Sequence, residues 1–294
     1  GAWAGGVRCR FGEATASGGW SGGASRVRCV TPVSVGGASG WVGVQLSSFH
    51  GALSSGGSFY YHASLTASGA APSLGPERGG TRVSVLGVGF RDAYTLRCAF
   101  GSSVSAPVLA RYVDESQLEC SSALHASSVV GVELSMNGQQ YAPSGVWYTY
   151  QSAALLRSIS PSSALAEGGT PLTVHGGGFS SSSESVGALL CRFNGTSSGR
   201  ASYVSASALV CNTSRSLGGP VPLEVTSNGR EYTADGVQFE FVSLTVHGVV
   251  PWSGPERGGT VVTIAGSRLS DASPLRCRFV VGSASGGVAS LSDG

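Results

Sequence analysis

The sequence contains no lysine, and charged residues of all kinds make up only 12% of its 294 positions. An ordinary soluble domain has about 25%. All of its basic side chains are arginine or histidine, and the formal net charge is +2. The chain therefore lacks the dense basic patch of a nucleic-acid-binding protein. With so little charge, solubility must have another source, and we expect attached glycans or contacts with partners to supply it.

Long apolar runs and metal-binding patterns are missing too. No apolar run approaches the 18 residues that suggest a membrane span, so none is expected in this segment. No CxxC pair and no Asp-x-Asp calcium loop occurs, so we expect no metal and no cofactor. Gly19–Gly23 formally fits the G-x-S-x-G nucleophile motif, but no helix is expected after it. We therefore expect no catalytic residues and no enzymatic activity.

A repeat with a period of about 90 residues is the strongest positive signal. The tripeptide Gly-Gly-Thr occurs three times, at Gly79–Thr81, Gly168–Thr170 and Gly258–Thr260. A proline precedes each copy (Pro72, Pro161 and Pro251), and apolar residues alternate after it, as in Val83 and Val85. Alternation with a period of two predicts a half-buried strand. We find no segment with helical periodicity.

The later half of each repeat also recurs. Gly145–Tyr150 matches Gly236–Phe241, and both have alternating aromatic residues that predict a closing strand. Asn137-Gly138 and Asn228-Gly229 each follow an alternating apolar run, which is a strong hairpin signal. Short strands with glycine-rich turns predict an all-β, immunoglobulin-like sandwich in each repeat.

These repeats predict four modules, at residues 1–66, 67–153, 154–243 and 244–294. The first is expected to lack its beginning and the fourth its end. The stretch from the last aromatic residue of one module to the next module's proline is nearly constant, as from Tyr150 to Pro161. Short and equal linkers would hold successive modules in a fixed relation, as in a rod.

The cysteines fall into pairs within these modules. Cys9 and Cys29, Cys98 and Cys120, and Cys191 and Cys211 are 20 to 22 residues apart, which predicts one disulfide in each module. Zinc is the alternative, but the histidines do not recur with the cysteines. Cys277 is left over, and its partner is expected beyond the chain end. Disulfides persist in oxidising compartments, so we expect an extracellular protein, secreted or on the cell surface.

Two sequons agree with this compartment. Asn194-Gly195-Thr196 and Asn212-Thr213-Ser214 predict N-linked glycans, expected to project from one end of adjacent strands. A serine run, interpreted as a loop, and a serine after Pro161 are candidate O-glycosylation sites, with a plain polar loop as the alternative: Ser180, Ser181, Ser182, Ser183 and Ser162.

The ordered set of motifs resembles the IPT/TIG domain, an immunoglobulin-like module of plexins, fibrocystin-like surface proteins and some transcription factors. The resemblance rests on the proline, Gly-Gly-Thr, the Cys-x-Phe strand, the second cysteine and the closing aromatic strand. It covers essentially the whole chain, although Ser267–Leu269 departs from the usual Gly-Phe. The fold hosts unrelated functions, so the resemblance specifies architecture more than activity.

Three functions remain open. The first is a structural or adhesive component of a glycosylated extracellular rod or filament, whose partners are its own glycans, neighbouring modules and other copies of the chain. The second is the ligand-binding ectodomain of a plexin-like or fibrocystin-like receptor. The third is an accessory module of a carbohydrate-active enzyme. Glu77-Arg78 is either a contact with the preceding module or a solvated turn, and Trp147 is expected to be an exposed aromatic.

Overall fold

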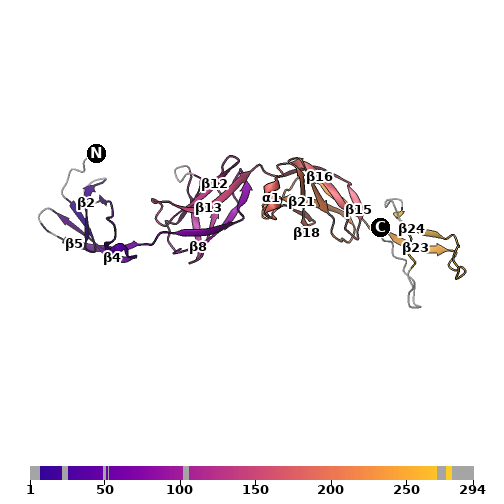
Figure 1. Cartoon of the computed structure of the whole chain (residues 1–294), viewed down its shortest axis with the longest axis horizontal. Coiled ribbons are helices and arrows are strands. Elements are labelled where there is room, and N and C mark those ends of the chain that lie inside the picture. Colours follow the sequence, from indigo (N-terminus) through magenta and orange to yellow (C-terminus); the bar gives the residue numbers. More distant parts are fainter. Residues whose placement is uncertain are drawn as a thin grey trace. The chain divides into compact units, whose positions relative to one another are not determined.

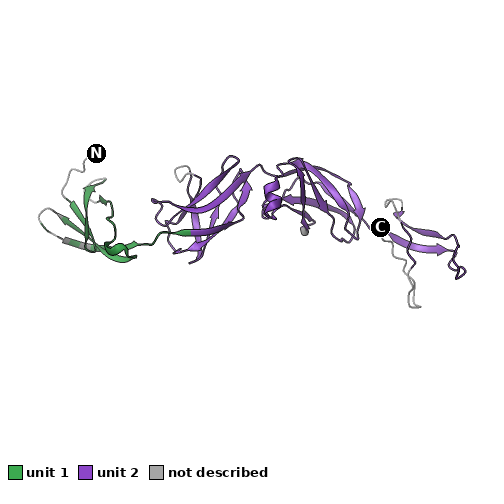
Figure 2. Ribbon diagram, in the orientation of Figure 1, with its two compact units in different colours: residues 1–66 green, residues 67–294 purple. Residues whose placement is uncertain are grey.

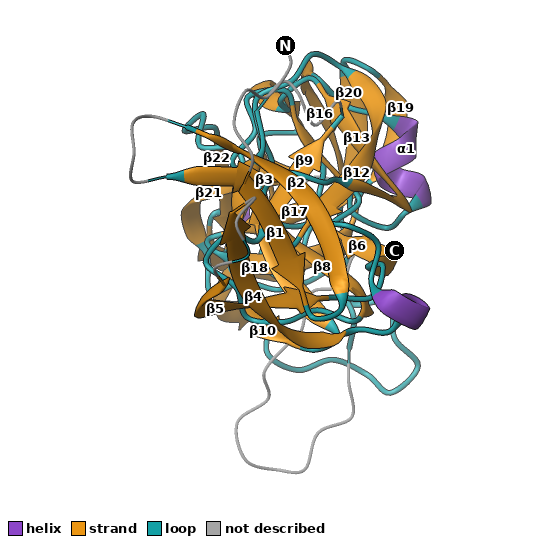
Figure 3. Cartoon of the chain, turned by 90° about the vertical axis from the view of Figure 1, so that its left-hand side faces the viewer, coloured by secondary structure: helices purple, strands orange, loops and turns teal. Residues whose placement is uncertain are grey.

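The computed structural model describes residues 7–21, 26–48, 51, 53–101, 106–269 and 276–279. Strands form nearly all of the regular structure in these residues (Figures 1 and 3), which confirms the all-β prediction. The chain divides into two compact units, residues 1–66 and residues 67–294 (Figure 2).

The first unit is a single antiparallel sheet in the order β3-β2-β1-β4-β5. Cys9 on β1 and Cys29 on β3 form a disulfide that passes over Gly18 of β2, where a Cβ would lie 2.6 Å from Cys29 Sγ. Because glycine has no side chain, Gly18 leaves room for the disulfide. The elements are β1 (Val7–Phe11), β2 (Ala14–Trp20), β3 (Val27–Cys29), the 3₁₀ turn η1 (Val35–Gly37), β4 (Gly40–Ser48) and β5 (Leu53–Tyr61).

The second unit begins with a sandwich of eight strands, named here the β6–β13 sandwich. The strand order is β6-β8-β11-β10-β9-β12-β13-β7, and β10 pairs with β11 along one part and with β9 along another. β10 thus links the two layers of the sandwich, β6-β8-β11 on one side and β9-β12-β13-β7 on the other. The strands are β6 (Thr66–Ala71), β7 (Leu74–Pro76), β8 (Arg82–Val88), β9 (Arg97–Phe100), β10 (Val108–Asp114), β11 (Gln117–Ser121), β12 (Ser128–Ser135) and β13 (Ala142–Gln151).

A second copy of this arrangement follows, named here the β14–β22 sandwich. Its sheets have the orders β14-β16-β20-β19 and β15-β22-β21-β17-β18, so two strands, β18 and β19, take the place of β10. The elements are β14 (Leu155–Ser160), β15 (Ser163–Leu165), β16 (Pro171–Gly177), α1 (Ser181–Ser185), β17 (Leu190–Phe193), β18 (Thr196–Arg200), β19 (Ser202–Ser205), β20 (Ala208–Asn212), β21 (Gly219–Thr226) and β22 (Gln238–Val242). A hairpin of β23 (Thr245–Val250) and β24 (Thr263–Ser267) comes last.

The same cluster of three aromatic rings recurs in the first unit and in both sandwiches. In the β6–β13 sandwich, Tyr148 packs edge-on against both Phe100 and Tyr150, with ring centroids 5.1 and 5.0 Å apart. The matching rings in the β14–β22 sandwich are Phe193, Phe239 and Phe241, and those of the first unit are Phe11, Phe59 and Tyr61. Alternation on the closing strand aims both of its aromatic side chains inward.

In both sandwiches, the peptide bond before the repeated proline lies where the first strand of the module crosses from one sheet to the other. β6 pairs with β8, and after the cis Ala71–Pro72 bond β7 pairs in parallel with β13. Ser160–Pro161 stands between β14 and β15 in the same way. The repeated proline therefore marks the point at which one strand closes both layers of the sandwich.

One prediction about secondary structure was wrong. Ser181–Ser185, interpreted as part of a loop, forms the short helix α1. Ser180 caps it, because its Oγ accepts a hydrogen bond from the Ser182 N–H at 3.2 Å. A helix of five residues is too short to produce a periodic apolar pattern, so the sequence contained no helical signal to detect.

Candidate functional site

The two complete sandwiches meet through a set of polar contacts, here called the junction. Thr81, at the start of β8, donates from Oγ1 to Oε2 of Glu231 in the loop before β22, at 3.1 Å. Asn228 Nδ2 donates to the same carboxylate oxygen and lies 3.4 Å from Thr81 Oγ1. Thr81 and Asn228 are both buried. One carboxylate of the later sandwich is therefore bound by a hydroxyl of the earlier one.

A second contact lies beside the first. Gln151, the last residue of β13, donates from Nε2 to Ser183 Oγ at 2.9 Å, and Ser183 Oγ donates back to Gln151 Oε1 at 3.1 Å. Ser183 has no exposed surface. Each such hydrogen bond contributes about 1 kcal/mol, and leaving one of these buried groups unpaired costs about 1–3 kcal/mol. These hydrogen bonds therefore favour one relative arrangement of the end of β13 and the helix α1 of the next sandwich.

The loop that carries Glu231 is held in shape by its own asparagine. Asn228 Oδ1 accepts the N–H groups of Arg230 and Glu231, at 3.0 and 3.1 Å. Asn137 does the same for Gln139 and Gln140 in the preceding sandwich. Both Asn-Gly steps connect the strands that the hairpin signal predicted, but the connections are longer than two residues because this side-chain turn replaces a tight one.

Tyrosine hydroxyls lie beneath the junction. Burial raises the pKa of Tyr148, and the carboxylate of Glu231 adds to the rise. Burial also raises the pKa of Tyr150, whose Oη donates to the carbonyl oxygen of Ala123 at 2.7 Å. That bond ties the closing strand to the loop after Cys120. Both phenols stay neutral at physiological pH, because their pKa values lie above the ordinary value near 10.

Glu77 and Arg78 lie in a turn, in agreement with the solvated-turn alternative. Glu77 accepts the N–H of Ser127 through Oε1 at 3.0 Å, which closes a loop of its own sandwich. Arg78 is exposed and lines a pocket beside the following sandwich. Sequence reasoning missed this placement, because no local pattern specifies which module an exposed side chain faces.

Six of the seven cysteines are paired. The structure joins Cys9 to Cys29, Cys98 to Cys120, and Cys191 to Cys211, with Cα atoms 6.1 to 6.3 Å apart. The last two bonds connect opposite sheets of their sandwiches. Cys277 is an exposed free thiol.

The predicted N-glycosylation sites are both exposed. Asn194 occupies the turn between β17 and β18 with φ +48°, and Asn212 ends β20. Both strands run away from the junction, so the two side chains belong to the opposite end of the β14–β22 sandwich. They do not stem from adjacent strands, however, because β17 and β20 lie in different sheets.

The candidate O-glycosylation sites are not equivalent. Ser162, Ser181 and Ser182 are exposed, and Ser180 is half-buried because it caps α1. Ser183 is buried and bonded to Gln151, which removes it from the candidates in the folded protein. Ser183 is a junction residue instead.

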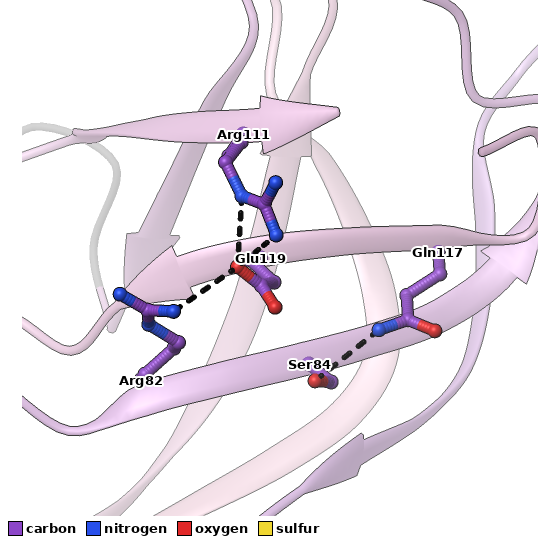
Figure 4. A network of polar contacts seen from close by, with 5 residues as sticks. All are labelled: Arg82, Ser84, Arg111, Gln117 and Glu119. Atoms are coloured by element: carbon purple, nitrogen blue, oxygen red, sulfur yellow. Dashed lines mark hydrogen bonds and ion pairs between the residues drawn. The ribbon is translucent and has the colours of Figure 1, made fainter. Parts of the chain in front are cut away.

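The arginines beside the cysteines, such as Arg97 and Arg192, are exposed or half-buried wherever the structure describes them. On the open face of the β6–β13 sandwich, Arg111 donates to Oε2 of Glu119 through Nε and Nη2, at 2.9 and 2.7 Å (Figure 4). Arg82 approaches the same oxygen at 3.9 Å. Exposed ion pairs contribute at most about 1 kcal/mol, so this cluster stabilises the sandwich only slightly. Trp147 is 64% exposed, in agreement with its position in the sequence.

Within the described ranges, no group of three or more His, Cys, Asp or Glu side chains is placed to hold a metal ion. No helix there is long and apolar enough to cross a membrane.

A family profile described as "TIG: IPT/TIG domain" matches residues 65–150 and 154–241, more than half of the chain. The chain belongs to the IPT/TIG domain family. These two IPT domains correspond to the β6–β13 and β14–β22 sandwiches, and they confirm the resemblance found in the sequence.

Similarity to individual proteins is more distant. Fibrocystin-L of Mus musculus is 25% identical over 197 residues, which is 66% of this chain and 4% of that protein. The chain therefore spans only a small part of this curated relative. The solved extracellular region of Plexin A4 is 14% identical, with a TM-score of 0.39 over 84% of this chain and 27% of that one. Invasin, a bacterial integrin-binding protein, is 11% identical with a TM-score of 0.23, over 90% and 60% of the two chains.

Proposed function

We propose that this chain is a non-enzymatic segment of an extracellular, glycosylated structural or adhesive filament. IPT modules at residues 1–66, 67–153, 154–243 and 244–294 would repeat along it. The junction is the observation that carries the proposal. Buried polar groups of two modules are paired there with each other, whereas a flexible linker would leave them to water. A filament needs such fixed connections, because it transmits position and force from one module to the next.

The chemistry of the modules supports this setting. Disulfides within the modules are typical of oxidising compartments. Exposed asparagines at the end of the β14–β22 sandwich opposite the junction can carry glycans without disturbing it. Those glycans would supply the hydration that a chain with 12% charged residues lacks.

The test is whether the two sandwiches tumble together. In ¹⁵N relaxation measurements on the whole chain, amides of the β6–β13 and β14–β22 sandwiches should share one rotational correlation time. Glu231→Ala should separate the two values, because it removes the carboxylate that Thr81 and Asn228 bind. Gln140→Ala is the matched control, since Gln140 occupies the equivalent place in the Asn137 loop and bonds only within it. Independent tumbling of the unchanged protein would contradict the proposal.

The second candidate is the ligand-binding ectodomain of a fibrocystin-like or plexin-like receptor. The similarity to Fibrocystin-L favours it. Fractionation of source cells separates the two candidates. A filament component should be released without detergent in large assemblies, whereas a receptor should stay with the membranes until detergent is added.

A further inference from the structure

A pocket of about 280 Å³ lies at the junction, between the end of β13 and the loop that precedes β22. Its size is near the lower limit of ordinary ligand sites, which begin at about 300 Å³. Pro76 and Arg78 come from the earlier sandwich, and Ser227, Glu231 and Tyr232 from the later one. The pocket therefore exists only while the two sandwiches are joined.

Three of its polar groups have unused hydrogen-bonding capacity among the described residues. Ser227 is buried, with 8% of its surface exposed, and its Oγ has no hydrogen-bond partner. Glu231 uses only Oε2 for Thr81 and Asn228, which leaves Oε1 available. Arg78 is exposed, and its guanidinium has no partner within the described segments. An unpaired buried hydroxyl costs about 1–3 kcal/mol, so Ser227 in particular fits a group that a ligand satisfies.

Apolar surface lies beside these groups, and the other polar residues of the lining are Gln151, Ser152, Asn228, Thr233 and Asp235. Pro76, Ala153 and Ala154 supply small aliphatic surfaces, and Tyr232 supplies an aromatic ring. Arg192 lies over that ring, 3.7 Å from its centroid, and is itself bonded to Glu224 at 2.7 Å. Arg192 therefore covers one face of the Tyr232 ring, and the remaining surface of the ring lines the pocket.

We propose that this pocket binds a single neutral sugar residue. A sugar ring presents apolar C–H surfaces beside a crown of hydroxyls that both donate and accept. The pocket offers the complement of each: aliphatic and aromatic wall, a carboxylate oxygen that accepts, a guanidinium that donates, and a serine hydroxyl that does both. The lining holds two carboxylates, Glu231 and Asp235, and one guanidinium, Arg78, which disfavours an anionic ligand. The inference is separate from the proposed filament, because the pocket requires a joined pair of modules in either setting.

The experiment is saturation-transfer NMR on the full chain, secreted with its disulfides and stripped of N-glycans. The probes are the methyl glycosides of glucose, galactose, mannose and N-acetylglucosamine. At least one should bind with a Kd in the millimolar range, as expected of a single small ligand. Ser227→Ala and Arg78→Ala should each weaken binding at least about fivefold, since each removes one hydrogen bond to the ligand.

The controls distinguish binding from folding. Arg82→Ala removes an arginine of the same sandwich outside the pocket and should leave the Kd unchanged. Ser227→Ala should not lower the melting temperature, because its hydroxyl has no protein partner to lose. Absence of saturation transfer for all four glycosides at ~20 mM, far above a millimolar Kd, would overturn the proposal. Binding that persists unchanged in both pocket variants would overturn it equally.

Discussion

The hydroxyl of Tyr148 occupies the space into which a side chain at Gly75 would project. A Cβ built on Gly75 would lie 2.1 Å from Tyr148 Oη and 2.7 Å from Thr81 Oγ1. In the β14–β22 sandwich, Phe239 replaces the tyrosine, and the residue in the place of Gly75 is Ala164. In the β6–β13 sandwich a tyrosine hydroxyl thus faces a glycine, and in the β14–β22 sandwich a phenylalanine without a hydroxyl is combined with an alanine.

Gly75→Ala should destabilise the β6–β13 sandwich by about 1–3 kcal/mol, the usual cost of overpacking a core. Adding Tyr148→Phe should restore most of the loss, because the double variant reproduces the pair that Ala164 and Phe239 form. Hydrogen exchange followed by mass spectrometry reports on the β8 and β12 amides separately from the other modules. Equal protection in the single and double variants would show that the hydroxyl is not the clashing group.

The cysteines predict a simple thiol count. In denaturant without reductant, one thiol per chain should react with an alkylating reagent, and peptide mapping should place it at Cys277. After reduction, all seven cysteines in the sequence should react. A second reactive thiol before reduction would mean that one of the three disulfides is not formed. Loss of the Cys191–Cys211 bond should cost about 3 kcal/mol, the chain-entropy value for a loop of this length.

The second sequon separates glycosylation from folding at neighbouring residues. Ser214→Ala removes the acceptor signal of Asn212, so the protein secreted from a eukaryotic host should lose one enzymatically removable glycan. Thr213→Ala keeps the sequon but deletes the Oγ1 that accepts the Thr170 N–H at 3.0 Å. That variant should keep the glycan and lose about 1 kcal/mol of stability. Intact mass before and after glycan removal, with a melting curve, distinguishes the two outcomes.

Alkaline pH should destabilise one sandwich more than the other. The pKa values of Tyr148 and Tyr150 are raised by burial, so above about pH 10 the unfolded chain ionises these phenols while the folded chain does not. Stability from these groups is therefore complete below pH 10 and falls as pH rises further. The corresponding residues of the β14–β22 sandwich are Phe239 and Phe241. Phenylalanine does not ionise, so that sandwich should not lose stability in this way.

The measurement is melting temperature by calorimetry from pH 8 to pH 11, for the unchanged chain and for Tyr148→Phe. The phenylalanine variant should show a shallower decline at the alkaline end. An identical decline in both proteins would assign the alkaline instability to other groups.

The sequence by itself determined the module. The alternating residues after the three Gly-Gly-Thr copies form β8, β16 and β24, the closing aromatic residues form the repeated ring clusters, and the cysteines pair within modules. These features are readable because strand periodicity and cysteine spacing depend on residues close together in the chain, and because the repeat displays each pattern more than once.

Only the tertiary structure decided what lies between modules. Thr81 and Glu231 are 150 positions apart, and nothing local to either residue indicates that they share a hydrogen bond. Ser183 reads as one more serine in a polar run, yet packing against Gln151 buries it completely. A contact between modules depends on how two finished sandwiches present their ends, and that surface is assembled from loops whose conformations follow from folding rather than from any repeating pattern.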